Sequence, residues 1–159
     1  MRLKDKVAII TGGSRGIGFA TAKAFLKEGA AVAVAASSQA NADKAVDKLK
    51  AEYPNSSIMG ISPALGDFES VKNAFNSVYE NFGKIDILVN NAGTSESTPL
   101  ANYTDELFSK VMTLNVNGVF NATKAAADIM AVSGSGVILN TSSMVSIYGQ
   151  PSGVAYPTS

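Results

Sequence analysis

The chain alternates strictly between short apolar runs and stretches in which apolar residues recur at helical spacing. Strands are predicted at residues 7–10, 31–35, 57–61, 85–89 and 136–140. Continuous apolar strands joined by helices are typical of a parallel sheet whose two faces are both covered. Because crossovers between parallel strands are right-handed, this order predicts an α/β fold with a doubly wound parallel sheet, in a single domain over residues 1–159.

Apolar spacing also predicts the helices between these strands. The helix after the first strand is predicted to place Ile17, Ala20 and Ala24 on one face. Further helices are expected at about 42–53, 71–82 and 104–130. Pro54 and Gly83 end the first two of these, because proline lacks the N–H that a helix needs and glycine tolerates a left-handed cap.

The fifth predicted strand, 136–140, lies close to the end of the sequence. A complete dinucleotide-binding sheet has about six strands or more. An apolar strand with no neighbour on one side is an exposed edge and an aggregation hazard. We therefore expect the domain to be incomplete at its C-terminal end.

Composition excludes several classes of function. The sequence has neither histidine nor cysteine, which excludes a Ser-His-Asp triad, disulfides, and imidazole or thiolate metal sites, so no metal is predicted. Thirteen basic and thirteen acidic residues cancel, and no basic cluster indicates a nucleic-acid partner. The apolar runs are too short to span a membrane and the first residues do not resemble a signal peptide, so a cytoplasmic protein is expected.

A glycine-rich turn joins the first strand to the first helix, where a phosphate-binding turn belongs. Gly12 would permit the tight turn, Gly16 would let the backbone approach a pyrophosphate, and Gly18 would let helix and sheet pack closely. Arg15 stands at the helix N-terminus, where a cation opposes the helix dipole and a bound anion would remove the conflict. A tight turn with a solvated arginine is the structural alternative.

The pattern Thr11-Gly-x-x-x-Gly-x-Gly resembles that of the short-chain dehydrogenase/reductase family, and the resemblance continues along essentially the whole chain. Three further motifs are similar to those of the family and stand in the same order: Asn90-Asn91-Ala92-Gly93, Asn115-Val116-Asn117-Gly118, and Ser142-Ser143 with Tyr156 thirteen residues after Ser143. Within the family the chain looks most like 3-oxoacyl-carrier-protein reductases and related carbonyl reductases.

The resemblance implies a Rossmann-like fold and hydride transfer between a nicotinamide cofactor and a small-molecule carbonyl or alcohol. Tyr156 would be the acid/base, Ser143 would donate a hydrogen bond to the substrate oxygen, and Asn115 would hold a water. The nucleotide would be bound by the following residues: Gly12, Ser14, Arg15, Gly16, Ile17, Gly18, Ser37, Ser38, Asn90, Ala92 and Gly93. Members of the family are typically dimers or tetramers, so a homodimer or homotetramer is expected.

The chain departs from the family pattern in two places. The Tyr-x-x-x-Lys motif reads Tyr156-Pro-Thr-Ser159, and the sequence ends before the lysine position. We therefore expect a chain truncated within this motif. The aspartate that the family usually has after the third strand aligns with Ala64, whereas Asp67 is expected to cap the next helix.

A phenol is a reasonable proton donor in a sequence without histidine. Free tyrosine has a pKa of about 10, which suits neutral pH poorly. A nearby ammonium group and a cationic nicotinamide would lower that pKa. Taken singly, Tyr156 could be a packed aromatic residue, Ser142 and Ser143 could be loop serines, and Asn115 could mark a helix kink.

The nature of the cofactor depends on the turn after the second strand. An acidic residue there would bind the 2′-hydroxyl of NAD and repel the 2′-phosphate of NADP. The stretch 34–39 has no acid, whereas Ser37 and Ser38 can donate hydrogen bonds and Arg15 supplies charge. The sequence thus favours NADP over NAD, with a plain polar loop as the alternative for the two serines.

The sequence leaves two alternatives to an oxidoreductase open. The 159 residues could form a nucleotide-binding fragment without catalytic activity, because the lysine and the last strands are absent. A structural or interaction protein with a degenerate fold is the third possibility. Met144, Val145, Ile147 and Tyr148 favour an apolar substrate wall, although such residues could equally pack in a core.

Overall fold

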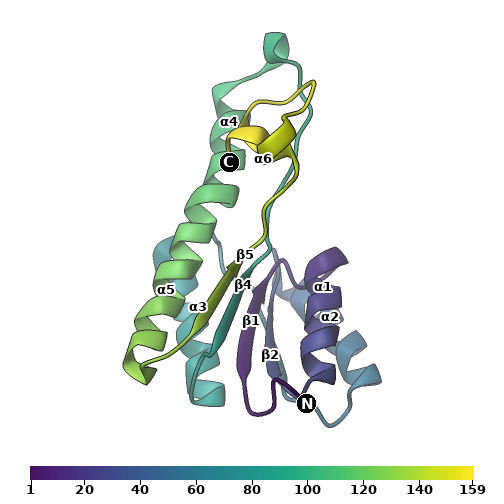
Figure 1. Cartoon of the computed structure of the whole chain (residues 1–159), viewed down its shortest axis with the longest axis vertical. Helices are drawn as coiled ribbons and strands as arrows, with labels where there is room; N and C mark the ends of the chain where they lie inside the picture. The colour runs from purple at the N-terminus through teal and green to yellow at the C-terminus, as the bar shows by residue number, and fades with distance from the viewer.

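The computed structural model describes all residues from 1 to 159 and has a parallel five-stranded sheet between two layers of helices (Figure 1). The strand order is β3-β2-β1-β4-β5. The strands are β1 (Val7–Thr11), β2 (Ala31–Ala35), β3 (Ile58–Ile61), β4 (Ile87–Asn90) and β5 (Val137–Asn140). This confirms the predicted doubly wound sheet, because the chain returns to the centre after β3 and pairs β4 with β1.

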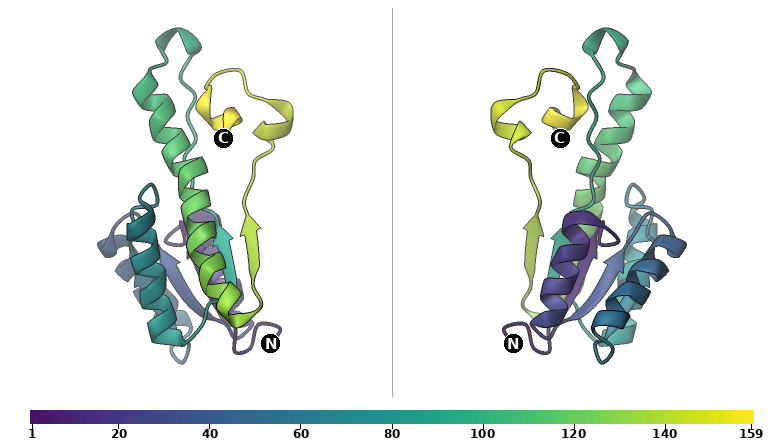
Figure 2. Two further views of the ribbon diagram at one scale, coloured as in Figure 1. Left: turned by 90° about the vertical axis from the view of Figure 1, so that its left-hand side faces the viewer. Right: turned by 90° about the vertical axis from the view of Figure 1, so that its right-hand side faces the viewer.

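Helices α1 (Gly16–Lys27) and α2 (Gln39–Glu52) cover one face, and α3 (Phe68–Phe82) and α5 (Gly118–Ser133) cover the other (Figure 2). The remaining helices are η1 (Leu100–Asn102), α4 (Asp105–Met112), η2 (Thr113–Asn117), α6 (Val145–Tyr148) and α7 (Ala155–Thr158). Each face has its own apolar core: Leu26 and Leu49 pack in one, and Phe75 and Met130 pack in the other. No helix is both long and apolar enough to cross a membrane.

The two ends of α3 are capped by the residues that the sequence predicts. Asp67 caps α3, where its Oδ1 accepts a hydrogen bond from the Ser70 N–H at 2.8 Å. Gly83 ends the same helix with a φ of 80°, in the left-handed region that favours glycine. The buried residues of α2 are Ala42, Ala45 and Leu49, which recur at helical spacing.

The predicted face of α1 is wrong. Ile17 is 71% exposed, and Ala20 and Ala24 are exposed as well. The buried stripe consists of Gly18, Ala22 and Leu26, at i, i+4 and i+8. The close approach of Gly18 to the preceding turn determines which residues of α1 face the sheet. The spacing of apolar residues alone cannot predict that contact.

The helix expected over 104–130 is divided in the structure. It begins as predicted, with Thr104 capping α4, but η2 is a π-helical segment between α4 and α5. The helix then continues to Ser133 and ends before Gly134, which has a φ of 75°. A π-helical turn inside a helix is often found at a functional site, and this one contains Asn115.

The fifth strand is an exposed edge. Val137 is 55% exposed and Leu139 is 50% exposed, whereas all residues of β1 are buried. After β5 the chain extends beyond the sheet toward α4, and α7 packs against α4 (Figure 2). The expected bare edge is therefore present in the structure.

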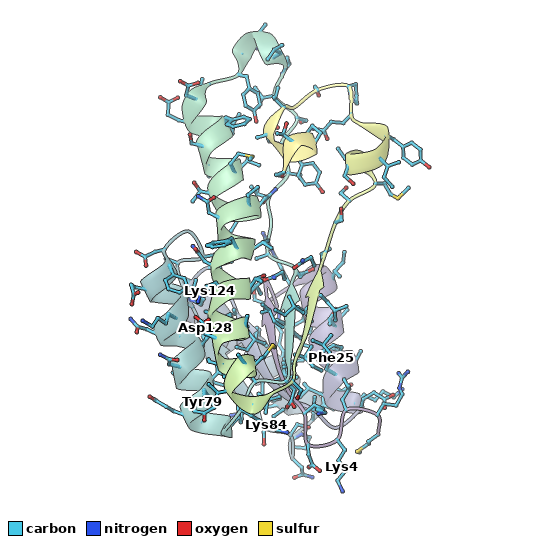
Figure 3. The ribbon with its side chains drawn as sticks, turned by 60° about the vertical axis from the view of Figure 1, so that its left-hand side comes forward. Lys4, Phe25, Tyr79, Lys84, Lys124 and Asp128 are labelled. Atoms are coloured by element: carbon cyan, nitrogen blue, oxygen red, sulfur yellow. The ribbon has the colours of Figure 1, made fainter.

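Asp86 connects β1 and β4 at the end of the sheet where these strands begin. Its Oδ2 accepts a hydrogen bond from the Val7 N–H at 2.9 Å, and the ammonium groups of Lys6 and Lys84 lie 3.1 and 3.2 Å from its oxygens. Figure 3 shows Lys84 at this end of the molecule. Burial alone would raise the pKa of the Asp86 carboxyl, but the Val7 N–H and the two ammonium groups outweigh it and lower that pKa.

We expect Asp86→Asn to lower the free energy of unfolding by about 1.5–3 kcal/mol at neutral pH, the range for a hydrogen bond to a charged group. Because the folded-state pKa of Asp86 is lowered, its contribution is present above the unfolded pKa of about 3.9 and is lost as pH falls through the folded-state value. Urea unfolding at a series of pH values, with the exposed Asp47→Asn as control, tests this. A wild-type-to-variant difference that stayed constant down to the lowest pH would contradict it.

Candidate nucleotide and catalytic site

A cavity of about 840 Å³ opens at the carboxyl ends of the central strands. Ligands of doubly wound sheets bind at this edge, where the strand order reverses between β1 and β4. The residues that line it come from five segments, among them Gly12, Ser14, Arg15, Gly16 and Ile17; Ser37, Asn41, Lys44 and Lys48; Ala64 and Leu65; Asn91, Ala92, Gly93 and Thr94; and Leu114. The cavity therefore contacts the glycine turn, the start of α2 and the loop after β4.

The glycines of the turn have different structural roles. Gly12 has a φ of 63°, and a Cβ atom there would lie 2.9 Å from the Ala92 Cα. A Cβ atom at Gly18 would lie 2.4 Å from the Gly12 carbonyl oxygen, so Gly18 permits the close packing of α1 on the turn. Gly16 has a φ of 56°, and a Cβ atom there would meet no other atom within 4 Å, so its backbone faces open space.

The start of α1 is suited to an anion. No side chain caps it, and no acidic residue lies in its first turn. The exposed Arg15 stands at the N-cap position. The N–H groups of the first helical turn have no partner within the helix and carry partial positive charge. The predicted phosphate-binding turn thus has the backbone geometry that such a site requires.

Thr11 and Asn91 join the glycine turn to the loop after β4. The Thr11 hydroxyl oxygen accepts hydrogen bonds from the N–H groups of Asn91 and Ala92, both at 3.0 Å. The Asn91 side-chain amide donates to the carbonyl oxygens of Thr11 at 3.1 Å and Gly12 at 3.3 Å. Asn91 was not predicted as a site residue, although the motif Asn90-Asn91-Ala92-Gly93 contains it.

Asn90, Gly18 and Ser38 lie outside the cavity lining. Asn90 is 3% exposed, and its amide donates to Thr123 Oγ1 at 3.0 Å and to Asn140 Oδ1 at 2.9 Å. Ser38 caps α2 through a hydrogen bond from the Asn41 N–H at 3.3 Å. A direct role for these three residues in nucleotide binding stays a prediction, and the contacts observed are structural.

Two lysines of α2 were missed by the sequence analysis. Lys44 and Lys48 line the cavity together with Asn41, and Asn41 donates a hydrogen bond to the Ser37 hydroxyl at 3.4 Å. Residues 41, 44 and 48 lie on one face of a helix. That spacing, directly after the second strand, is the signal that could have identified them.

Asn115 connects the loop after β4 to the C-terminal segment. Its Oδ1 accepts from the Thr94 N–H at 2.9 Å, and its Nδ2 donates to the Thr94 carbonyl at 3.0 Å and to Ser159 Oγ at 2.9 Å. Ser159 Oγ in turn donates to the Tyr156 carbonyl oxygen at 3.0 Å. The structure thus brings Asn115 and the segment of Tyr156 together, and Asn115 lies in the π-helical segment η2.

Ser143 and Tyr156 are both half-buried. The Ser143 hydroxyl accepts a hydrogen bond from the Val145 N–H at 3.3 Å, and Ser143 shares no hydrogen bond with Asn115 or Tyr156. α6, which follows Ser143, packs against α7, which carries Tyr156. The three candidate catalytic residues therefore come from adjacent segments above the sheet.

The sequence matches the family described as short chain dehydrogenase over residues 6–159. The chain belongs to this family. It is 57% identical, over its whole length, to a 3alpha-hydroxysteroid dehydrogenase of Mediterraneibacter gnavus. It is 36% identical, again over its whole length, to a 3-oxoacyl-(acyl-carrier-protein) reductase of Thermotoga maritima. In both comparisons the chain spans 64% of the relative's length.

Solved structures of a dehydrogenase and a reductase have the same fold. An NAD+-bound xylitol dehydrogenase superposes with a TM-score of 0.93 at 33% identity, covering 99% of this chain and 60% of the other. A levodione reductase gives a TM-score of 0.93 at 30% identity, covering 99% of this chain and 61% of the other. Both enzymes therefore continue well beyond the part that matches, in agreement with the incomplete sheet seen here.

Substitutions at Gly18 and Gly16 should have unequal effects on stability. We expect Gly18→Ala to lower the free energy of unfolding by about 3 kcal/mol, the upper end for an overpacked site, because the new methyl group meets a backbone carbonyl. Gly16→Ala should cost about 1 kcal/mol, because only its left-handed conformation disfavours a side chain. Urea unfolding of both variants measures the difference, and equal or reversed costs would refute this reading of the turn.

Proposed function

We propose that these 159 residues are the N-terminal part of an oxidoreductase that transfers a hydride between NADP(H) and a carbonyl or alcohol substrate. The observation that carries the proposal is the continuity between cavity and candidate catalytic residues. Thr94 lines the cavity, and its N–H and carbonyl are both held by Asn115. A ligand that extends from the glycine turn to Thr94 would reach the region of Tyr156.

The charge of the cavity supports NADP as the cofactor. Arg15, Lys44 and Lys48 line it, and no aspartate or glutamate does. Three cations without an acid favour a ligand with several phosphates, and an extra 2′-phosphate would strengthen that attraction. Ala64 and Leu65 leave an apolar surface suited to the adenine ring.

The candidate catalytic residues have separate tasks in this proposal. When bound, the nicotinamide supplies or accepts the hydride. The Tyr156 phenol gives a proton to the substrate oxygen in reduction, and the Ser143 hydroxyl donates a hydrogen bond to that oxygen. The amide N–H groups of Asn115 are committed to Thr94 and Ser159, but its Oδ1 keeps a second lone pair that can bind the predicted water.

The substrate is proposed to be a bulky apolar alcohol or ketone. Met144 is 61% exposed, Ile147 71% and Tyr148 78%, so α6 presents an apolar surface beside the segment of Tyr156. The relative at 57% identity is a 3alpha-hydroxysteroid dehydrogenase, which makes 3-oxo and 3α-hydroxy steroids the first compounds to test. 3-Oxoacyl thioesters are the second class, after the name of the Thermotoga maritima relative.

The complete enzyme is proposed to be a cytoplasmic homodimer or homotetramer that contacts its partner through α5. Phe120 on α5 is 66% exposed, and Val116, in η2 directly before α5, is 39% exposed. An ion pair between Lys124 and Asp128 lies on the same helix (Figure 3). Exposed apolar residues beside charged ones are typical of an interface core with a polar rim.

Arg15→Ala should weaken NADPH binding roughly 10- to 100-fold, the equivalent of one lost charge-assisted hydrogen bond. NADH binding should change little, because the lost contact is assigned to the 2′-phosphate. Cofactor titrations of the wild type and the variant measure both constants, and Arg2→Ala, an exposed arginine paired with Glu28, is the control. An equal loss for both cofactors would refute NADP specificity at Arg15.

Tyr156→Phe in the complete polypeptide should lower kcat by roughly 100-fold or more, the lower end for loss of general acid catalysis. NADPH binding should be unchanged, because the phenol acts only when the substrate oxygen takes its proton. The control is Tyr79→Phe, an exposed tyrosine on α3 (Figure 3). If Tyr156→Phe kept full turnover, the proposed acid/base would be wrong, whereas NADPH binding without any turnover in the wild type would favour a nucleotide-binding protein.

A further inference from the structure

Glu96, in the loop between β4 and η1, is a half-buried carboxylate with four hydrogen-bond donors around it. Its Oε1 accepts from the Val154 N–H at 2.9 Å and from the Tyr156 N–H at 3.5 Å. Its Oε2 accepts from the Thr98 N–H at 3.0 Å. The Tyr103 hydroxyl donates to the same carboxylate. Glu96 thus joins its own loop to the segment that carries Tyr156.

Two of these donors belong to the start of α7, the helix that contains Tyr156. The first N–H groups of a helix have no partner within it, and the side chain at the N-cap usually accepts from them. Val154 occupies the N-cap of α7, and its side chain has no oxygen that could accept these hydrogen bonds. Glu96 takes its place from a distant part of the sequence, and the Tyr103 hydroxyl oxygen accepts from the Ala155 N–H at 3.0 Å.

The backbones of the two segments are also in close contact. Gly153 has a φ of 91°, and a Cβ atom there would lie 2.6 Å from the Glu96 carbonyl oxygen and 2.9 Å from its Oε1. The Gly153 N–H donates to the Thr98 carbonyl at 2.9 Å. Gln150 Nε2 donates to the Glu96 carbonyl at 3.1 Å. The carboxylate therefore acts within a packed contact that leaves the start of α7 little freedom.

All the groups that donate hydrogen bonds to the Glu96 carboxylate are neutral. No lysine or arginine forms an ion pair with it. Burial alone would raise the pKa of Glu96, but the Thr98 N–H, the Tyr103 hydroxyl and the N–H groups at the start of α7 outweigh it and lower that pKa. The group is ionised at neutral pH, and hydrogen bonds to an ionised acceptor are stronger than neutral ones.

We propose that Glu96 is a positioning residue for the reaction: its carboxylate fixes the start of α7, and with it the place of the Tyr156 phenol relative to Asn115 and Ser143. This inference rests on the proposed function, in which Tyr156 is the acid/base. A reacting group displaced by about 1 Å can slow catalysis on the order of 100-fold. Glu96 does not line the nucleotide cavity, so its loss should change kcat and leave NADPH affinity as it is.

The test compares variants of the complete polypeptide in steady-state reduction and in NADPH titration. We expect Glu96→Ala to lower kcat roughly 10- to 100-fold with unchanged NADPH affinity. Glu96→Gln, which keeps the length and one acceptor oxygen, should recover most of that loss. Tyr103→Phe removes the hydroxyl that accepts from the Ala155 N–H and donates to Glu96, but it leaves the backbone N–H groups bonded to Glu96, so it should lower kcat less, by roughly 3- to 10-fold. Glu80→Ala, an exposed glutamate on α3, is the matched control.

Wild-type kcat in Glu96→Ala would overturn the inference, and so would a loss of kcat matched by a loss of NADPH affinity. If Glu96→Ala does not fold, the kcat of Tyr103→Phe is the deciding measurement. A wild-type kcat in Tyr103→Phe would overturn the inference as well. Tyr156→Phe is measured in the same assay. Full activity in Tyr156→Phe means that the proposed function fails, whereas an inactive Tyr156→Phe with a fully active Glu96→Ala means that only the role of Glu96 fails.

Discussion

The candidate site depends on the hydrogen bonds that the Thr11 hydroxyl group accepts. This group lies at the end of β1 and accepts hydrogen bonds from the N–H groups of Asn91 and Ala92, at the end of β4. These are the two strands between which the sheet order reverses. Loops diverge at such a point and leave a crevice. Thr11 and the Asn91 amide fix the width of that crevice, and they fix the glycine turn against the loop that follows β4.

The loop after β4 connects the glycine turn to two segments farther from the sheet. Its first residues are bonded to the glycine turn, Thr94 is bonded to Asn115 in η2, and Glu96 is bonded to the start of α7. One loop thus contacts the cavity beside the glycine turn, the π-helical turn and the segment of Tyr156. We infer that a change in this loop would alter nucleotide binding and proton transfer separately, according to which of the three contacts it breaks.

The features set by local sequence were predictable. The five strands lie within a few residues of their expected positions, because a buried parallel strand must be continuously apolar. The caps by Asp67 and Gly83 follow from local backbone chemistry. Motif spacing also located the glycine turn, since it joins the end of the first strand to the start of the first helix.

The features set by long-range contacts were missed or misread. The buried face of α1 follows from the contact of Gly18 with Gly12, and apolar spacing instead favoured Ile17. The division of the long helix at η2 accompanies the bonds between Asn115 and Thr94, which are separated by 21 residues. Glu96 bonds to Val154 across 58 residues, and no local pattern marks a carboxylate that caps a distant helix.

In the proposed reaction, a nicotinamide nucleotide bound at the glycine turn delivers a hydride to a ketone held beside Tyr156. The most direct measurement uses NADPH with deuterium at both positions of the hydride-donating nicotinamide carbon, the complete polypeptide and a ketone that it reduces, with mass spectrometry of the alcohol. The account predicts that each alcohol molecule carries one deuterium on the former carbonyl carbon. Alcohol that forms without the label, or label that appears in the solvent instead, would contradict it.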